Sequence, residues 1–353
     1  MRSPLLDRSG AVAAEAPDET VAAHYGEPYA EQRALAAGRA VVDRSDREVI
    51  RITGADRLKW LNDLSSQKLD TLAPGVPAQT LFLDAQGRVE HHLTLVDDGT
   101  SVWGHVEPGA SAALIAYLEK MRFMLRVEVG DETSAYAVVT VAPPRPAGSA
   151  DEPATVPVPE GAIAIGGDLL VPRERLAGLP EELGLRPAGL WAYEALRVEA
   201  HLPRAGFETD HKAIPHEVGW IGAAVHLTKG CYRGQETVAR VHNLGHPPRR
   251  LVFLHLDGSV DILPPHGAPV TLGAGTTAEG DVEDGARPGQ IGFVGTSARH
   301  HELGPIALAV VKRTVPVDAV LLAGGVTASQ EVIVPPDAGR NVTIDPALRR
   351  RIR

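Results

Sequence analysis

The residues with the clearest chemical potential in this 353-residue chain lie in one short stretch, Lys229-Gly230-Cys231-Tyr232-Arg233-Gly234-Gln235-Glu236. It contains the only cysteine, with a lysine two positions before it and an arginine two positions after it. Residues 235–240 then have the pattern of a helix whose first turn is acidic. A thiol between two cations and ahead of a helix N-terminus should ionise more readily than a free thiol, so Cys231 is the candidate reactive group. The alternative, a small buried cysteine, would need neither the cations nor the glycines.

The composition limits the classes of function. Hydrophobic residues make up 44% and charged residues 23% of the chain, which is ordinary for a globular protein, and the length favours two or three domains. The net charge of −10 argues against an extensive nucleic-acid surface. An RNA-binding module remains a weaker alternative, since a local patch could form from Arg233, Arg240, Arg249 and Arg250.

The single cysteine excludes a disulfide framework and a cluster held by four cysteines of one chain, and it fits a reducing compartment. No apolar run approaches the roughly 20 residues of a membrane span. Charged residues interrupt residues 1–16, which therefore lack the apolar core of a signal peptide. We expect a cytoplasmic protein.

The order of predicted elements favours an α+β fold with antiparallel sheet. Asp84-Ala85-Gln86-Gly87 has the composition of a hairpin turn between two strands, and helical patterns flank the hairpins. From residue 249 onward short strands punctuated by Gly and Pro predict a separate small β-barrel or sandwich, with a boundary near residues 245–248. No glycine-rich phosphate loop follows a strand, which argues against nucleotide hydrolysis and a dinucleotide-binding fold.

The fourteen histidines do not predict a metal site. His91 and His92 are adjacent on a predicted strand, so their side chains should point to opposite faces. His211 and His216, with acidic neighbours, form only a weak ligand pattern, and no HExxH or CxxC motif is present. We expect structural or surface histidines and no metal centre.

The cysteine stretch resembles the signature of the YgfZ family of folate-binding proteins, relatives of the aminomethyltransferase (T-protein) of the glycine cleavage system. Other segments are similar to that family in the same order along the chain, over about residues 31–335. They are Arg51-Ile52-Thr53-Gly54-Ala55-Asp56, Leu196-Arg197-Val198-Glu199-Ala200, Ile214-Pro215-His216-Glu217 and Gly292-Phe293-Val294-Gly295-Thr296-Ser297. The cysteine stretch is the most specific of these matches.

The resemblance implies a three-domain clover-leaf, with two ferredoxin-like α+β domains and a C-terminal antiparallel β-barrel around a central opening. It implies tetrahydrofolate or a one-carbon derivative in that opening, with Glu199 as the pterin contact and Arg197 near it. It also implies an accessory role in iron–sulfur cluster assembly or repair, including the clusters of tRNA-modifying enzymes, with cluster enzymes or carriers as transient partners. Cys231 would be the reactive thiol in that role.

One departure from the resemblance bears on catalysis. Aminomethyltransferases carry paired aspartates after the hairpin glycine, whereas this chain has Gly87-Arg88-Val89-Glu90-His91-His92. Histidine lacks the carboxylate that would stabilise a developing cation or move a proton. We therefore expect no true aminomethyltransferase activity, with a tetrahydrofolate-dependent aminomethyl or one-carbon transferase as the alternative function.

The expected organisation has four segments. Residues 1–30 are a partly ordered lead-in, and residues 31–245 form the folate-binding α+β region as two interleaved subdomains. That region includes a proline-rich surface insertion at residues 143–161. Residues 246–340 form the barrel, and residues 341–353 are a basic, frayed tail.

Overall fold

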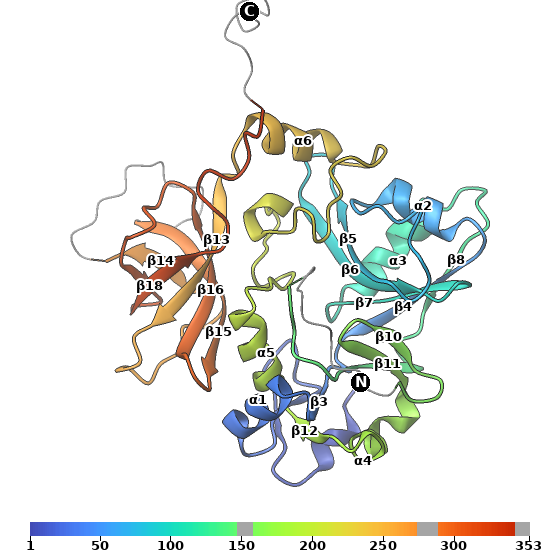
Figure 1. Cartoon of the computed structure of the whole chain (residues 1–353), viewed down its shortest axis with the longest axis horizontal. Helices are drawn as coiled ribbons and strands as arrows, with labels where there is room; N and C mark the ends of the chain where they lie inside the picture. Colours follow the sequence, from blue (N-terminus) through green and yellow to red (C-terminus); the bar gives the residue numbers. More distant parts are fainter. Residues whose placement is uncertain (147–157, 274–288, 343–353) are drawn as a thin grey trace, which may run out of the picture.

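The computed structural model describes residues 1–146, 158–273 and 289–342. In these ranges the chain forms two α+β units and a closed β-barrel, which lie around a central region (Figure 1). The expected α+β class with a C-terminal antiparallel barrel is confirmed. Most of the predicted proline-rich insertion and of the basic tail lies outside the described residues.

The first α+β unit is built on a continuous stretch of chain. Its antiparallel sheet has the order β5-β6-β7-β4-β8. The elements are β4 (Glu48–Thr53), α2 (Arg57–Leu64), β5 (Pro77–Leu83), β6 (Val89–Asp97), β7 (Ser101–Val106), α3 (Ser111–Lys120) and β8 (Glu128–Asp131). Alternation along β6 buries Leu93 and Leu95 in a core shared with α2 and α3, and directs His92 and Thr94 to the opposite face.

The second α+β unit surrounds the first in sequence. Its sheet has the order β10-β11-β9-β3-β12, in which β12 pairs with β3 in parallel and the other pairs are antiparallel. The elements are α1 (Pro28–Ala36), β3 (Ala40–Asp43), β9 (Tyr136–Thr140), β10 (Ile163–Ile165), β11 (Asp168–Pro172), η2 (Arg173–Gly178), α4 (Leu179–Leu183), β12 (Arg186–Ala188) and α5 (Leu190–Glu199). The two units are therefore interleaved, because the first lies between β3 and β9.

The N-terminal segment is packed into the second unit, although we expected residues 1–30 to be a partly ordered lead-in. It forms η1 (Pro4–Asp7), β1 (Val12–Ala13) and β2 (Ala22–His24). Leu5 is 2% exposed within an apolar cluster of this unit, and the Ser3 hydroxyl donates to the buried carboxylate of Asp43. These contacts are made by single buried residues and not by an amphipathic element. The sequence of this segment therefore has no periodic pattern from which they could be predicted.

The C-terminal part is a closed barrel with the order β13-β16-β15-β14-β17-β18. Its strands are β13 (Arg249–Leu256), β14 (Pro269–Leu272), β15 (Gln290–His300), β16 (Gly304–Lys312), β17 (Leu321–Ala323) and β18 (Val326–Val332). η3 (Pro215–Val218) and α6 (Gln235–Leu244) lie in the segment that joins it to the α+β units. Alternate residues of β13, such as Val252 and Leu254, fill the barrel interior.

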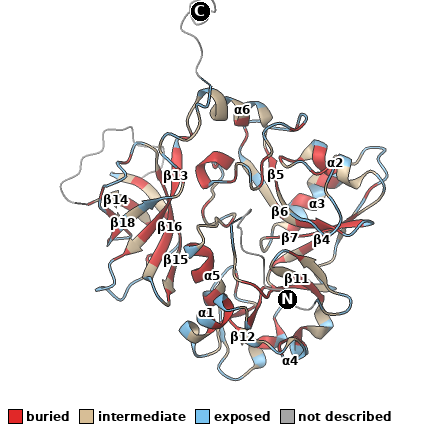
Figure 2. Cartoon of the chain, viewed as in Figure 1, coloured by how far each residue is buried: buried red, intermediate tan, exposed pale blue. Residues whose placement is uncertain are grey.

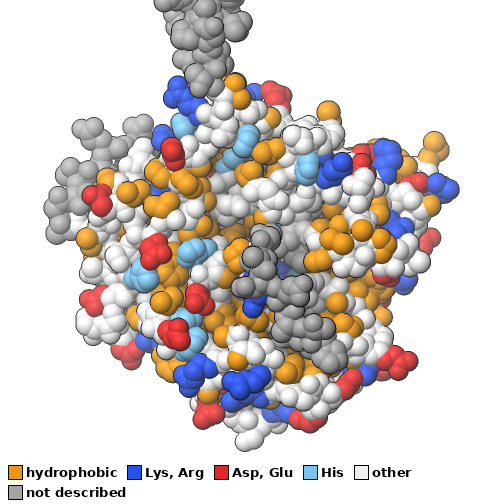
Figure 3. Space-filling view, viewed as in Figure 1, with side chains coloured by type: hydrophobic (Ala, Val, Ile, Leu, Met, Phe, Trp, Pro, Cys, Tyr) orange, Lys and Arg blue, Asp and Glu red, His pale blue; other side chains and the backbone are white. Residues whose placement is uncertain are grey.

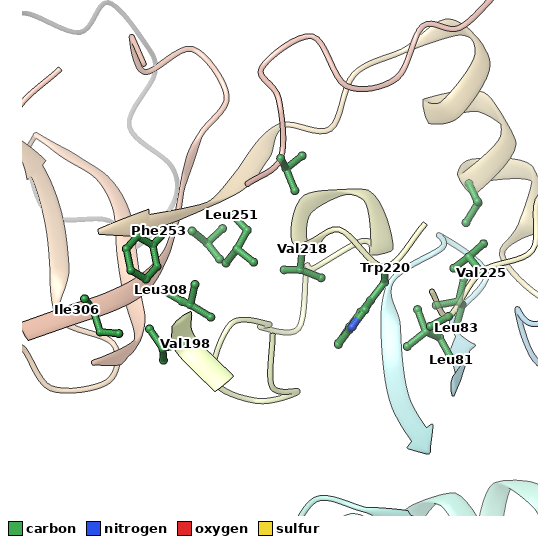
Figure 4. Close-up of a cluster of buried hydrophobic side chains, with 14 of the residues drawn as sticks. Leu81, Leu83, Val198, Val218, Trp220, Val225, Leu251, Phe253, Ile306 and Leu308 are labelled. Atoms are coloured by element: carbon green, nitrogen blue, oxygen red, sulfur yellow. The ribbon is translucent and has the colours of Figure 1, made fainter. Parts of the chain in front are cut away.

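The outer face of the barrel packs into a hydrophobic core that it shares with both α+β units. Leu251 and Phe253 of β13 pack with Val198 of α5, Trp220 after η3 and Leu81 of β5 in one buried cluster (Figure 4). Buried residues accordingly run through β13, β16 and α5 (Figure 2). This cluster fixes the barrel against the α+β units and positions the walls of the cavity between them.

Candidate functional site

A cavity of about 850 Å³ lies where the parts meet. The first sheet contributes residues of β5, β6 and β7, and the second contributes residues of β9 and β11. The end of α5 with the following residues 200–204, and residues 218–223 from the end of η3 onward, also contribute to the lining. Residues 143–146 also line it, although the sequence placed them in a surface insertion.

His92 stands on the cavity wall. Its ring lies against Trp220 with centroids 4.8 Å apart, and its Nε2 is 3.1 Å from Oε1 of Gln79. Burial lowers the pKa of His92 to about 4, with a smaller contribution from the Arg47 guanidinium. His91 points to the other face of the sheet and packs against Phe82, as the alternation predicted. The cavity therefore presents a neutral imidazole at neutral pH where the aminomethyltransferase pattern has a carboxylate.

A buried ionic cluster extends from this wall, and the sequence did not reveal it. Arg204 donates to Asp18 at 2.6 and 2.8 Å and to Glu107 at 2.7 Å. Arg47 donates to Glu107 at 2.6 Å and to Nδ1 of His105 at 2.9 Å. Burial opposes ionisation of Glu107, but the two arginines outweigh it and hold its pKa below the usual range. These arginines are therefore already neutralised by carboxylates of the protein.

A second part of the ionic cluster lies at the edge of β11. The Asp168 carboxylate is 3.2 Å from Nη1 of Arg44 and 3.1 Å from Nε2 of His105. Burial opposes ionisation of Asp168, and Arg44 and His105 reverse that effect and lower its pKa. Arg44 also lies 3.9 Å from the ring centroid of Tyr193. Tyr193 and Trp220 thus give the cavity two aromatic side chains beside fixed charges.

Arg197 lines the cavity and holds the end of α5 in place. Its side chain is 3% exposed and donates to Glu194 and to the Thr296 hydroxyl, both at 2.6 Å. It also bonds Glu208 at 3.2 Å and the carbonyl of Leu202. With its donors engaged in this way, Arg197 ties α5 to β15 and to the chain that follows the helix.

Glu199 is the last residue of α5, and the structure places it beside the barrel, outside the cavity lining. Its side chain is 45% exposed, and Oε2 is 3.3 Å from Nε2 of His300. The Nδ1 of His300 accepts the backbone N–H groups of Glu302 and Leu303, so the ring proton belongs on Nε2 and faces Glu199. The expected folate contact is therefore held by a barrel histidine.

Cys231 is exposed, in a loop that runs from residue 226 to α6. Lys229 turns away from the thiol, and its amine donates to the carbonyls of Asn62 and Ser65 at the end of α2. Burial lowers the pKa of this lysine to about 8. The cysteine does not line the cavity, so the structure places the thiol and the cavity as two separate sites.

The second flanking cation is also engaged. Arg233 pairs with Glu90 of β6 at 3.0 Å, so the two cations that the sequence placed beside the thiol anchor the loop to the first unit instead. Gly234 has φ 83°, and a Cβ there would come 2.5 Å from the carbonyl oxygen of Asp84. This glycine lets the loop pack on the β5–β6 turn before α6 begins at Gln235, as predicted.

The basic patch considered for RNA does not form on the surface. Arg233 is paired as above, Arg240 pairs with Glu236 at 2.7 Å, and Arg249 is bound by two carboxylates. Arg250 is buried in the barrel. Their charges are therefore balanced or withdrawn from solvent.

Two further features bear on the class of protein. Within residues 1–146, 158–273 and 289–342, no three His, Cys, Asp or Glu side chains are grouped to hold a metal ion. In the same ranges, no helix combines the length and apolar character needed to cross a bilayer.

Comparison with known proteins gives relatives of two kinds, while no protein-family model matches the chain. An aminomethyltransferase of Symbiobacterium thermophilum is 39% identical over 108 residues, 30% of this chain and 28% of that protein. A mitochondrial iron–sulfur cluster assembly factor of Mus musculus is 27% identical over 293 residues, 74% of this chain and 78% of that protein. The tRNA-modifying protein YgfZ of Yersinia enterocolitica is 24% identical over 249 residues, 64% of this chain and 75% of that protein.

The solved structure of the glycine cleavage system aminomethyltransferase T from Bartonella henselae matches with a TM-score of 0.73. The match covers 97% of this chain and 99% of that one, at 17% identity. The chain is therefore similar in sequence to aminomethyltransferases and to iron–sulfur cluster assembly factors. The expected three-part fold of the aminomethyltransferase type is confirmed. Two further relatives are aligned over only 56% and 15% of their own lengths, so this chain spans only part of them.

The chain departs from the aminomethyltransferase pattern at a position that the structure places in the cavity. His92 occupies the wall where the resemblance implies an aspartate. Two carboxylates that line the cavity, Glu107 and Asp168, are each bound by arginine. The cavity therefore has an imidazole at this position, and its carboxylates at Glu107 and Asp168 are held in ion pairs.

Proposed function

We propose that this protein binds tetrahydrofolate or a one-carbon derivative in the central cavity and supports iron–sulfur cluster assembly or repair. The observation that carries the proposal is the cavity itself, of about 850 Å³, in a chain with the fold of an aminomethyltransferase. Small-molecule sites commonly have volumes of roughly 300–1,000 Å³ and combine apolar surface with a few fixed polar groups.

The residues present fit a pterin with a polar tail. Trp220 and Tyr193 supply aromatic surface against a flat heterocycle, and His92 supplies a neutral imidazole. Arg44 and Arg47 supply fixed charge that carboxylates already balance. A bound folate would supply a carrier for one-carbon units, and the chain's own residues would bind it and limit access of water.

We retain Glu199 as the proposed pterin contact and Arg197 as its neighbour. A carboxylate that accepts two pterin N–H bonds could contribute about 1.5–3 kcal/mol per charge-assisted bond. Because Glu199 lies at His300 in this structure, binding requires its side chain to turn towards the cavity. Arg197 would keep the end of α5 in position while that happens.

Calorimetry with tetrahydrofolate tests this assignment. We expect Glu199→Ala to weaken binding at least about tenfold, which corresponds to 1.4 kcal/mol. Glu302→Ala, which removes an exposed carboxylate on the same side of the barrel, should bind like the wild type. Equal affinity in the wild type and Glu199→Ala would remove Glu199 from the site. Absence of folate binding to the wild type would reject the function.

Cys231 is the proposed reactive thiol of the cluster-supporting role. The thiol is exposed, and Gly230 leaves open space beside it. A thiolate could bind iron, accept sulfur or exchange with a partner disulfide. One thiolate does not complete a cluster, so contact with iron–sulfur enzymes or cluster carriers, including those that modify tRNA, would be transient. The cytoplasm is the proposed location.

The second candidate function is a tetrahydrofolate-dependent aminomethyl or one-carbon transferase. Relatives that are named aminomethyltransferases favour it. It would share the folate site but need a proton-transferring group near the folate nitrogen, where this chain has His92. A reconstituted glycine cleavage assay separates the two candidates, because only this one predicts methylenetetrahydrofolate as product.

A further inference from the structure

A second pocket lies on the second α+β unit, and none of its residues lines the central cavity. It has a volume of about 560 Å³ and lies between α1 and the strands that follow α1 and α4. Its lining residues are Ala30, Arg33, Ala34, Arg39, Gly184 and Arg186. Figure 3 shows a group of Lys and Arg side chains at the lower end of the molecule, where α1 lies in Figure 1.

The backbone brings the three arginines to one hollow. Arg33 is on α1, Arg39 precedes β3, and Arg186 opens β12, whose register with β3 starts with Arg186 opposite Ala40. The N–H of Arg186 donates to the carbonyl of Arg39 at 3.3 Å, which fixes these two residues side by side. The other lining residues are two alanines and a glycine, whose small side chains leave the pocket open.

The charge in this pocket is not balanced. Within the described residues, the side chains of Arg33 and Arg39 have no hydrogen bond or ion pair, and Arg186 has one carboxylate, Glu27 at 3.4 Å. Glu31, the acidic residue within α1, is buried and accepts three backbone N–H groups instead. Three guanidinium groups thus face one exposed carboxylate, in a protein whose net charge is −10.

We propose that Arg33, Arg39 and Arg186 form a binding site for a small phosphate-bearing ligand, such as pyrophosphate or the phosphate end of a phosphate ester. Guanidinium groups bind phosphate through paired N–H···O bonds. A carboxylate has two oxygens, which one guanidinium satisfies, whereas a phosphate dianion offers three or more oxygens to donors from several directions. Three arginines with an excess of two positive charges therefore match a dianion.

The surroundings favour a small ligand over a nucleic-acid strand. α4 places Glu181 and Glu182 three and two positions before Gly184 of the pocket, and they are paired with Arg8 and Arg175, while Glu27 is paired with Arg186. Because these arginines are already balanced by carboxylates, an extended polyanion that continued beyond the pocket would gain little attraction from them. The positive charge is confined to the hollow instead of forming a stripe.

Calorimetry of the full chain with pyrophosphate at low ionic strength tests the proposal. We expect saturable binding of one pyrophosphate, weakened about tenfold or more by each single Arg→Ala change and lost in the Arg33→Ala, Arg39→Ala, Arg186→Ala triple variant. Arg39→Lys should bind more weakly than the wild type, because lysine keeps the charge and loses the paired geometry. Arg88→Ala, which removes an exposed arginine of the β5–β6 turn, is the matched control and should bind like the wild type.

Several results would overturn the proposal. They are no saturable binding to the wild type, equal binding by the triple variant, and an equal loss in Arg88→Ala. Glutarate binding as tightly as pyrophosphate would refute the preference for phosphate, and a single-stranded RNA oligomer binding where pyrophosphate does not would refute the small-ligand assignment. The three side chains are exposed, so the thermal unfolding midpoint of the triple variant should match the wild type. Folate binding should also be unchanged, which makes this test independent of the central cavity.

Discussion

Replacing His92 with glutamine should change how stability depends on pH by an amount that follows from the cavity wall. Burial lowers the folded-state pKa of His92 from 6.5 to about 4. An unfolded chain takes up this proton near pH 6.5, whereas the folded protein resists it until about pH 4. The contribution of His92 to the free energy of unfolding is therefore fully present above pH 6.5. It is lost as the pH falls from 6.5 towards 4, at about 1.4 kcal/mol per pH unit. By pH 4.5 the loss from this one ring should reach about 2–3 kcal/mol.

The assay is urea unfolding followed by tryptophan fluorescence at several pH values from 7 to 4.5, since Trp220 packs on the His92 ring. Other groups titrate in the same window, so the useful quantity is the difference between the wild type and His92→Gln. Between pH 7 and pH 4.5, the free energy of unfolding of His92→Gln should rise by about 2–3 kcal/mol relative to that of the wild type. His211→Gln, at an exposed histidine, should follow the wild type. Parallel curves for the wild type and His92→Gln would refute a desolvated, neutral imidazole on the cavity wall.

Three further predictions address the thiol, the reaction and the loop. Cys231→Ser should fold and bind folate normally yet fail to support iron–sulfur enzymes in cells that lack the native protein, and full complementation would make the thiol dispensable. The wild type should form no methylenetetrahydrofolate in a reconstituted glycine cleavage assay because His92 replaces a carboxylate, and robust product formation would instead favour the transferase. Gly234→Ala should lower the free energy of unfolding by roughly 2 kcal/mol or more, since its Cβ would meet the Asp84 carbonyl at 2.5 Å. Gly230→Ala, where a Cβ meets nothing within 4 Å, should be nearly neutral in the same denaturation measurement, and equal losses in both variants would contradict this reasoning.

The parts of the fold that the sequence predicted are those encoded by neighbouring residues. The turn at Asp84–Gly87 is such a case, because Asp84 itself accepts the backbone N–H groups of Gln86 and Arg88 and closes the hairpin. Glycine and proline punctuation likewise predicted the barrel. The parallel pairing of β12 with β3 was not predictable in this way. About 145 residues separate the two strands, and no local sequence pattern indicates which strand pairs with β3.

In the candidate site, too, features set by neighbouring residues were predictable and contacts between distant residues were not. Residues 229–236 predicted the start of α6. They did not predict that Lys229 donates to carbonyl groups at the end of α2, which lie more than 160 positions away in the sequence. Arg204 binds Asp18 and Glu107, which are 186 and 97 positions distant, and each of these residues alone reads as an ordinary surface charge. Burial of the ionic cluster depends on the packing of all parts together, which a single sequence does not encode locally.

The interleaving of the two α+β units also sets the order in which a growing chain could fold. The first unit, residues 48–131, is contiguous and has all its strands available once it has left the ribosome. β3, by contrast, can pair only after β9 and then β12 have been made, and β12 begins about 145 residues after it in the chain. At 5–20 residues per second this delay is roughly 7–30 s. During that time Leu5, Val41 and Val42 have no core to enter, so the N-terminal 43 residues form the segment most exposed to chaperones and proteases during synthesis.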